Sequence, residues 1–419
     1  MGFNSWDCYG AGINEAQLLA IAAYMREHLL PFGWQYVVCD IQWYEPKARG
    51  VHYNKFTELC MDGYSRLIPA ENRFPSAAGG KGFRPIADRI HGMGLKFGVH
   101  LMRGIPRQAV HANTPTVTPG VTARDIAQSY SVCPWNTDMY GVDPDAPGAQ
   151  EYYDSVFALF AEWGVDYVKV DDIANTEYKP HAPYSAAREI EMMRRAIDRT
   201  GRPIVLSLSP GPAPIDAAFH LKQNANLWRM SGDFWDTPEA LDEMFRLCER
   251  WYPHVSPGCW PDCDMLPLGV LSMADRDPAM RARKTRFTES EQRMLMTLWC
   301  IFRSPLMYGG EATLTDDFTL SLLTNRALLA IDQRSAGNRP LVSNEKEAVW
   351  TCLDETGAPV FACFNLTNEA RTVVCPHGLA ACSATELWTN EAVCLTEGET
   401  AIPLAARSCK VFRVSGSEE

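Results

Sequence analysis

The chain has 419 residues, of which 46% are hydrophobic and 21% are charged. This length predicts about two or three domains, and this composition excludes general disorder. No stretch of the sequence approaches the roughly 18 consecutive apolar residues of a membrane helix. The formal net charge is 39 − 51 = −12, which disfavours binding to nucleic acid or to an anionic membrane surface.

The first residues and the cysteines indicate the compartment. The chain begins MGFNSWDCYG, without the basic and apolar segments of a secretory signal peptide. Fourteen scattered cysteines do not form a dense disulfide framework, and Cys259 and Cys263 lack the partners of a zinc site. We therefore expect a cytoplasmic protein with free thiols, with removal of an N-terminal segment as an open alternative.

Short apolar segments alternate with amphipathic helical patterns over the first three-quarters of the chain. The predicted strands are residues 2–6, 36–40, 95–101, 166–171, 204–209, 227–231, 258–264 and 305–308. The predicted helices are residues 15–30, 85–93, 149–163, 186–200, 238–251 and 288–302. Such alternation is typical of parallel strands with right-handed crossovers. Eight strands predict an α/β fold, a closed (β/α)₈ TIM barrel with its active site at the C-terminal strand ends.

The pattern changes after about residue 333. Short β-type segments follow at residues 348–353, 360–364, 371–375, 384–387 and 408–414, separated by Gly, Pro and Asn. They predict a small C-terminal antiparallel β-sandwich. We therefore expect a catalytic barrel at residues 1–333 and a β-sandwich domain at residues 334–419. The long loop at residues 104–148 follows a barrel strand, a position typical of a functional lid.

Polar and aromatic side chains follow the predicted barrel strands. The candidates are Trp6, Asp40, Trp43, His100, Arg103, Lys169, Asp171, Asp172, Ser209, Arg229, Asp233, Asp262 and Asp264. Asp172 could instead cap a helix, and Asp262 could fix a turn. Aromatic faces together with many hydrogen-bonding groups suit a sugar ring, which has apolar C–H faces and a rim of hydroxyls.

Two of these carboxylates suit the cleavage of a glycosidic bond. Lys169 and Asp171 are two residues apart on one strand, so they share a face, and the ammonium should keep Asp171 ionised as a nucleophile. Asp233 precedes Phe234 and Trp235, and apolar surroundings would raise its pKa as a proton donor requires. Carboxyl groups roughly 5 to 5.5 Å apart give retention of configuration, and roughly 6.5 to 9.5 Å gives inversion.

The chain resembles the α-galactosidases and α-N-acetylgalactosaminidases of glycoside hydrolase family 27 over nearly its whole length, apart from residues 104–148. The motifs that carry this resemblance, in family order, are MGFNSW, YVVCDIQW, LKFGVH, WGVDYVKVDD, LWRMSGD, CWPDCDML and SPLMYGG. The resemblance implies that Asp171 is the nucleophile and Asp233 the acid/base of a retaining mechanism without metal or cofactor. It also implies sugar contacts, at Lys169, Arg229, Trp6, Asp40 and Asp264.

Two positions depart from the family pattern. Family galactosidases usually have two consecutive aspartates after the second strand, whereas here Asp40 is followed by Ile41. An apolar residue there would suit a pyranose without a hydroxymethyl group, such as L-arabinopyranose; alternatively, His100 or Arg103 compensates. Ser209 stands where galactose-specific members have a glutamate, and a small residue resembles the N-acetylgalactosaminidase arrangement.

These observations predict a retaining exo-α-glycosidase of the α-galactosidase type. It would remove terminal α-D-galactosyl-type residues from a small oligosaccharide or glycoconjugate. An α-N-acetylgalactosaminidase and a β-L-arabinopyranosidase are alternatives within the family. A non-catalytic carbohydrate-binding barrel and a metal-dependent barrel hydrolase are alternatives from other classes. Neither nucleic acid nor a membrane is an expected partner, and association into a homo-oligomer is left open.

Overall fold

The computed structural model describes residues 1–273 and 282–415. Their contacts divide into two compact units. The first unit comprises Met1–Asp233, Met265–Lys284 and Met307–Thr315, and the second comprises Phe234–Asp264, Thr285–Leu306 and Asp316–Glu419.

The main sheet has eight strands in the order β10-β9-β8-β7-β3-β2-β1-β13. They are β1 (Gly2–Asn4), β2 (Tyr36–Cys39), β3 (Lys96–Met102), β7 (Tyr167–Asp171), β8 (Val205–Leu208), β9 (Leu227–Arg229), β10 (Trp260–Asp262) and β13 (Met307–Tyr308). Within the first unit the neighbouring strands pair in parallel, and Leu266 pairs in parallel with Tyr308 of β13. Each predicted strand overlaps an observed one, which confirms the predicted barrel.

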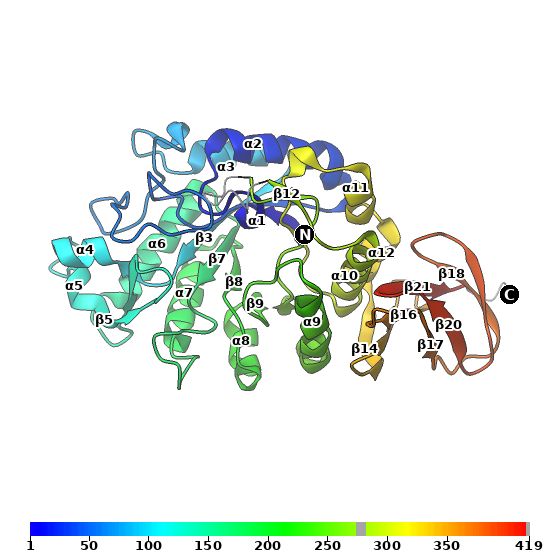
Figure 1. The fold of residues 1–419 in the computed structure, drawn as a ribbon. Helices are drawn as coiled ribbons and strands as arrows, with labels where there is room; N and C mark the ends of the chain where they lie inside the picture. The colour runs from blue at the N-terminus through cyan, green and yellow to red at the C-terminus, as the bar shows by residue number, and fades with distance from the viewer. Residues whose placement is uncertain (274–281, 416–419) are drawn as a thin grey trace. The chain divides into compact units, whose positions relative to one another are not determined.

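Helices follow the strands as predicted (Figure 1). In the first unit they include α2 (Glu15–Tyr24), α3 (Arg84–Gly92), α6 (Ala149–Trp163), α7 (Ala187–Thr200) and α8 (Ala218–Asn224); the second unit includes α9 (Pro238–Trp251) and α10 (Glu289–Phe302). Helix α2 begins with a reciprocal capping box between Asn14 and Gln17. The seven-residue α8 was not predicted, because so short a segment has little periodicity.

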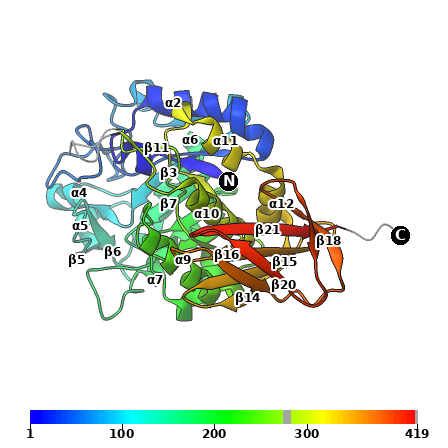
Figure 2. The same ribbon diagram turned by 45° about the vertical axis from the view of Figure 1, so that its right-hand side comes forward.

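The segment at residues 104–148 is folded. It contains β4 (Ile105–Pro106), α4 (Arg107–Ala112), α5 (Ala123–Ile126), β5 (Ala127–Val132) and β6 (Met139–Val142). The strands form a small antiparallel sheet in the order β4-β6-β5. Figure 2 shows α4, α5, β5 and β6 gathered together. The segment is therefore an ordered substructure, and its movement as a lid stays a prediction.

The C-terminal part of the second unit is antiparallel, as expected. After α11 (Asp317–Leu323) and α12 (Arg326–Arg334), its strands are β14 (Ala336–Ser343), β15 (Glu347–Leu353), β16 (Pro359–Asn365), β17 (Arg371–Cys375), β18 (Cys382–Glu386), β19 (Ala392–Leu395), β20 (Thr400–Leu404) and β21 (Ser408–Val414). Six form the sheet β14-β15-β16-β21-β18-β19, and β17 pairs with β20. Buried Phe361, Val373, Ile402 and Phe412 share one core across both sheets. The predicted boundary at residue 333 stays a prediction, and none of the described helices is long and apolar enough to cross a membrane.

Candidate active site

The register of the barrel strands brings polar side chains to one level of the sheet. His100 of β3 lies opposite Lys169 of β7, which lies opposite Ser207 of β8. Cys39 at the end of β2 lies opposite Val99, so the next residue, Asp40, comes level with His100. Asp171 is two residues beyond Lys169 and therefore leaves the same face one step nearer the C-terminal strand ends.

These ends surround a pocket of about 340 Å³. Its lining includes seven of the predicted site residues: Trp6, Asp40, His100, Lys169, Asp171, Ser209 and Asp233. Both predicted catalytic carboxylates thus face one cavity. The remaining lining residues are Val51, Tyr53, Trp135, Glu177, Pro210, Gly211 and Gly232. The roles of individual residues stay predictions, but a single cavity accommodates the predicted chemistry.

Asp171 is held from three directions. The Ser209 hydroxyl donates a hydrogen bond to Oδ1 at 3.0 Å, and the Asp172 backbone N–H donates to the same oxygen at 3.3 Å. Nε2 of His100 lies 3.4 Å from Oδ2. Burial by itself would raise the pKa of Asp171, but the contact and charge of His100, together with Lys169 and Ser209, lower it below the usual value. The carboxylate is therefore ionised and oriented, as a nucleophile requires.

His100 connects Asp171 with Asp40. Its Nδ1 lies 2.8 Å from Oδ2 of Asp40, and its side chain is 3% exposed. Burial opposes the charged imidazole, but the two carboxylates outweigh burial and raise the pKa of His100. Against the same burial penalty, His100 and Lys169 hold the pKa of Asp40 well below its usual range. When His100 is protonated, the two carboxylates and the two cations balance in charge, which lowers the cost of their burial.

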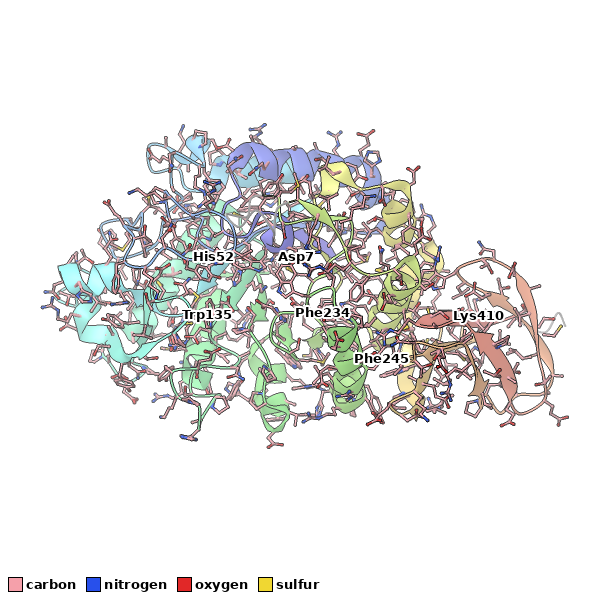
Figure 3. The ribbon with its side chains drawn as sticks, in the orientation of Figure 1. Asp7, His52, Trp135, Phe234, Phe245 and Lys410 are labelled. Atoms are coloured by element: carbon pink, nitrogen blue, oxygen red, sulfur yellow. The ribbon has the colours of Figure 1, made fainter. Side chains whose placement is uncertain are left out.

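Asp233 has different surroundings from those expected. Its side chain is 59% exposed, and its Oδ1 lies 3.5 Å from Nη2 of Arg229. Phe234 (labelled in Figure 3) belongs to the second unit, and its ring packs there against Phe287 and Trp299. The expected apolar environment of the Asp233 carboxyl group is therefore wrong. An exposed carboxyl group at the pocket wall can still reach both a departing oxygen and a water molecule.

Loop residues add an aromatic wall that the sequence did not reveal. Trp6 stacks on Tyr53 at 5.9 Å between ring centroids, and Tyr53 lies 5.6 Å from Trp135. Trp135 (labelled in Figure 3) belongs to the segment at residues 104–148. Aromatic rings of this kind pack against the C–H face of a sugar. Tyr53 and Trp135 lie in loops without a repeating pattern, so their only signal was their residue type.

Two predicted substrate contacts are wrong. Trp43 is fully buried; its indole N–H donates to the His100 carbonyl at 2.7 Å, and its ring packs edge-on against Phe83. Arg103 is 2% exposed and pairs with two buried carboxylates, Asp172 at 2.8 Å and Glu189 at 3.0 Å. Neither is among the described residues that line the pocket, so the suggestion that Arg103 compensates for Ile41 also fails.

Two further predicted contacts, Arg229 and Asp264, hold the backbone around Asp233. Nη2 of Arg229 donates to the Gly232 carbonyl. Within the second unit, Oδ2 of Asp264 accepts a hydrogen bond from the Phe234 N–H at 2.8 Å. Both residues thus anchor the chain on either side of Asp233, and their contact with a sugar stays a prediction.

A close backbone contact explains the glycine of the Pro-Gly-Pro sequence after β8. A Cβ atom at Gly211 would lie 2.2 Å from the Ser231 carbonyl oxygen and 2.7 Å from that of Arg229. No side chain fits there, because the backbone of this loop runs directly against the end of β9. Gly211 therefore brings backbone, instead of a bulky side chain, to the pocket beside Ser209.

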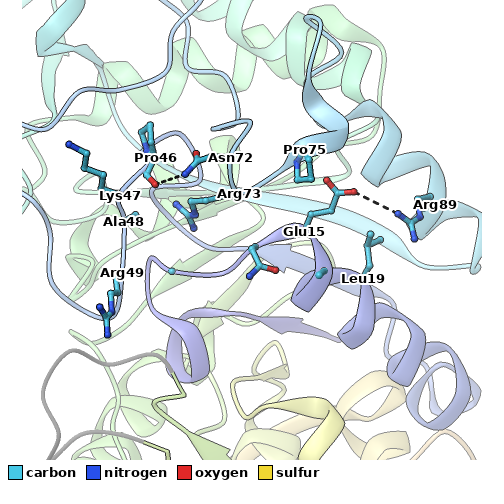
Figure 4. Close-up of a pocket in the computed structure, with 13 residues that line it drawn as sticks. Glu15, Leu19, Pro46, Lys47, Ala48, Arg49, Asn72, Arg73, Pro75 and Arg89 are labelled. Carbon is cyan, nitrogen blue, oxygen red and sulfur yellow. Dashed lines mark hydrogen bonds and ion pairs between the residues drawn. The ribbon is translucent and has the colours of Figure 1, made fainter.

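A larger pocket of about 750 Å³ lies elsewhere in the first unit (Figure 4). Among the described residues that line it, only Glu15 is acidic, and it pairs with Arg89 at 3.7 Å. A single carboxylate cannot provide both groups of a glycosidase pair.

Among the described residues, no group of three or more His, Cys, Asp or Glu is arranged to hold a metal ion.

A (β/α)₈ barrel whose strand ends present an ionised buried aspartate, an exposed aspartate and an aromatic wall around one pocket defines a carbohydrate-cleaving enzyme. Comparisons of the chain with known proteins agree with this class of enzyme. A family profile described as Alpha galactosidase A matches residues 140–334. A GH27 β-L-arabinopyranosidase from Geobacillus stearothermophilus is 51% identical, with a TM-score of 0.96 over all of this chain and 96% of that one.

Two other relatives are named for other activities. A Bacillus halodurans protein, a candidate α-N-acetylgalactosaminidase, is 46% identical with a TM-score of 0.89 over all of this chain and 97% of that one. Alpha-galactosidase 3 of Arabidopsis thaliana is 26% identical over 98% of this chain and 80% of its own length. The chain belongs to glycoside hydrolase family 27 and is a glycosidase.

Proposed function

We propose that this enzyme is a retaining exo-glycosidase that prefers terminal β-L-arabinopyranosides to the α-D-galactosides first predicted from the sequence. The two sugars have the same ring configuration and anomeric geometry, and they differ by one hydroxymethyl group. The observation that carries this preference is the apolar residue that follows Asp40. Ile41 is 1% exposed and stands where family galactosidases have their second aspartate; among the described residues, Asp40 and the apolar Val51 line the pocket and Ile41 does not.

The chain at Ile41 offers no hydrogen-bond partner to a hydroxymethyl group. The Ile41 backbone N–H is already used by Oδ1 of Asp40 at 2.8 Å, so it offers no donor to a sugar. A polar group that is buried without a partner costs about 1–3 kcal/mol. A pentopyranose has no such group to bury. The 51% identity with a β-L-arabinopyranosidase supports the same preference.

The proposed reaction has two steps. Asp171 attacks the anomeric carbon while Asp233 protonates the departing oxygen, which forms a glycosyl ester and releases the alcohol. Asp233 then removes a proton from water, which attacks the anomeric carbon, displaces the Asp171 carboxylate and releases the sugar with its original configuration. The contacts of Asp171 with Ser209 and His100 support the first role, and the exposure of Asp233 supports the second.

A second candidate activity is removal of α-N-acetylgalactosamine. Ser209 and Gly211 leave the wall near the end of β8 without the glutamate of galactose-specific members. This favours space for an acetamido group. The Ser209 hydroxyl is also needed by Asp171, however, so a small residue here serves the nucleophile in either case.

Three nitrophenyl substrates test the proposal: the β-L-arabinopyranoside, the α-D-galactopyranoside and the α-N-acetylgalactosaminide. We expect kcat/KM to fall in that order, with about 10-fold or more between the first two, because one carbon of difference in a pocket is worth about 1–3 kcal/mol. A preference for the galactoside would overturn the arabinoside assignment. If none of the three were cleaved, the proposed activity as a whole would fail.

A further inference from the structure

Arg103 makes three contacts with the two residues at the nucleophile. Its backbone N–H donates to the Asp171 carbonyl at 3.0 Å. Its Nε donates to the Asp172 carbonyl at 2.6 Å, and its Nη2 bonds Oδ2 of Asp172 at 2.8 Å. The guanidinium group thus holds both the backbone and the side chain of the residue that follows the nucleophile.

Asp172 has an unusual backbone. Its φ is +55°, in the left-handed region that L-residues other than glycine rarely adopt. Such a conformation persists only where the surroundings impose it. The conformation matters because the Asp172 N–H donates to Oδ1 of Asp171 at 3.3 Å. A rotation at Asp172 would withdraw that donor and release the Asp171 carboxylate.

The other end of Arg103 is held equally firmly. Nη1 bonds Oε1 of Glu189 at 3.0 Å, and Oε2 of Glu189 accepts hydrogen bonds from the Tyr153 hydroxyl at 2.6 Å and from the Val142 N–H at 3.1 Å. Val142 ends β6 in the segment that also supplies Trp135 to the pocket wall. The Tyr178 ring covers the guanidinium group at 5.0 Å.

We propose that Arg103 is a positioning residue, which fixes the backbone at Asp172 so that the Asp171 carboxylate points at the anomeric carbon. This inference rests on the proposed function, in which Asp171 is the nucleophile. Arg103 touches no substrate in this account. Its planar fork reaches the Asp172 carbonyl, the Asp172 carboxylate and Glu189 at once, and a lysine ammonium cannot span all three.

The test is Arg103→Lys, which keeps the charge and loses the fork. We expect kcat on the best nitrophenyl glycoside to fall by about 10- to 100-fold, because a misplaced reacting group costs about that much. KM should change less than about threefold, since the groups that bind the sugar remain in place. Arg407→Lys is the matched control, because Arg407 is a buried arginine that also bridges two carboxylates, Asp242 and Glu291, neither of which lines the pocket.

A kcat within twofold of wild type for Arg103→Lys would overturn the inference, as would an equal loss of kcat in Arg407→Lys at matched thermal stability. A crystal structure of Arg103→Lys supplies a readout that does not depend on the substrate. We expect Asp172 to leave the left-handed region and the Asp171 carboxylate to lose the Asp172 N–H. Unchanged geometry would refute the positioning role even if the proposed activity were correct, whereas inactive wild-type enzyme would refute the activity.

Discussion

Replacement of His100 by glutamine tests the electrostatics of the nucleophile. His100→Gln keeps a side-chain N–H near Asp171 but removes the imidazole, which lies 3.4 Å from its carboxylate and is positively charged when protonated. The charge of His100 helps to lower the pKa of Asp171 against the effect of burial. Without it, we expect the pKa of Asp171 to rise and the acidic limb of kcat/KM to move to higher pH.

The size of this shift follows from the geometry. An opposite charge within about 4–6 Å lowers a carboxyl pKa by about 1–3 units. Lys169 remains in place and also lowers the pKa of Asp171, so removal of His100 should cost only part of that range. We expect the pKa of Asp171 to rise by about 1–2, which corresponds to about 1.4–2.7 kcal/mol.

The wild-type profile of kcat/KM should also have a basic limb, because His100 loses its positive charge as the pH rises through its raised pKa.

The same groups make the stability of the fold depend on pH. Because the pKa of His100 is raised in the folded protein, its charge stabilises the fold fully below about pH 6.5. That contribution is lost as the pH rises through the raised pKa. The lowered pKa values of Asp40 and Asp171 act in the opposite direction: their contribution is present above about pH 4 and is lost as the pH falls through the lowered values.

The assay is the pH dependence of kcat/KM between about pH 3 and pH 9 with a nitrophenyl glycoside, since this profile reports the ionisations of the free enzyme. His91→Gln is the control, because His91 pairs with Asp166 at 2.8 Å and lines no part of the pocket. An active His100→Gln enzyme with an unmoved acidic limb would refute the electrostatic argument.

Three further changes have defined outcomes. Asp233→Asn should reduce kcat by about 10²–10⁴-fold on a substrate with a poor leaving group and much less on an aryl glycoside. The reason is that only a poor leaving group needs a proton donor. Equal losses on the two substrates would contradict the role of Asp233. Ile41→Asp should raise the kcat/KM ratio of galactoside to arabinopyranoside by about 10-fold or more, since a hydrogen bond to a charged group is worth about 1.5–3 kcal/mol; an unchanged ratio would remove Ile41 from specificity. Trp135→Ala should raise KM about 2- to 10-fold, as expected for a lost aromatic contact of about 0.5–1.5 kcal/mol, and an unchanged KM would place the sugar elsewhere.

The barrel could be predicted because its strands carry a strong local signal. Segments such as β7 and β8 are buried along almost their whole length, and their lengths and order are fixed by the alternation with helices. The rule that chemistry lies at C-terminal strand ends then brought Asp171, Lys169 and His100 together correctly. The register of the sheet places these side chains at one level, and residues at one level face one cavity.

The errors arise where the chain leaves the strands. Gln42 has a φ of +64°, which turns the chain so that Trp43 enters the core instead of the pocket. Arg103 follows β3 directly, but its direction depends on Asp172 and Glu189, which are distant in sequence. These contacts join residues that are distant in sequence, so neither the periodicity of the sequence nor a position at a strand end predicts them.

In the proposed mechanism, Asp171 forms a covalent bond with the sugar. A 2-deoxy-2-fluoro arabinopyranosyl fluoride should inactivate the enzyme with a mass increase of one glycosyl unit, and peptide mapping should place that unit on Asp171. Turnover without any labelled enzyme, together with release of the inverted sugar, or a label on another carboxylate, would contradict the account.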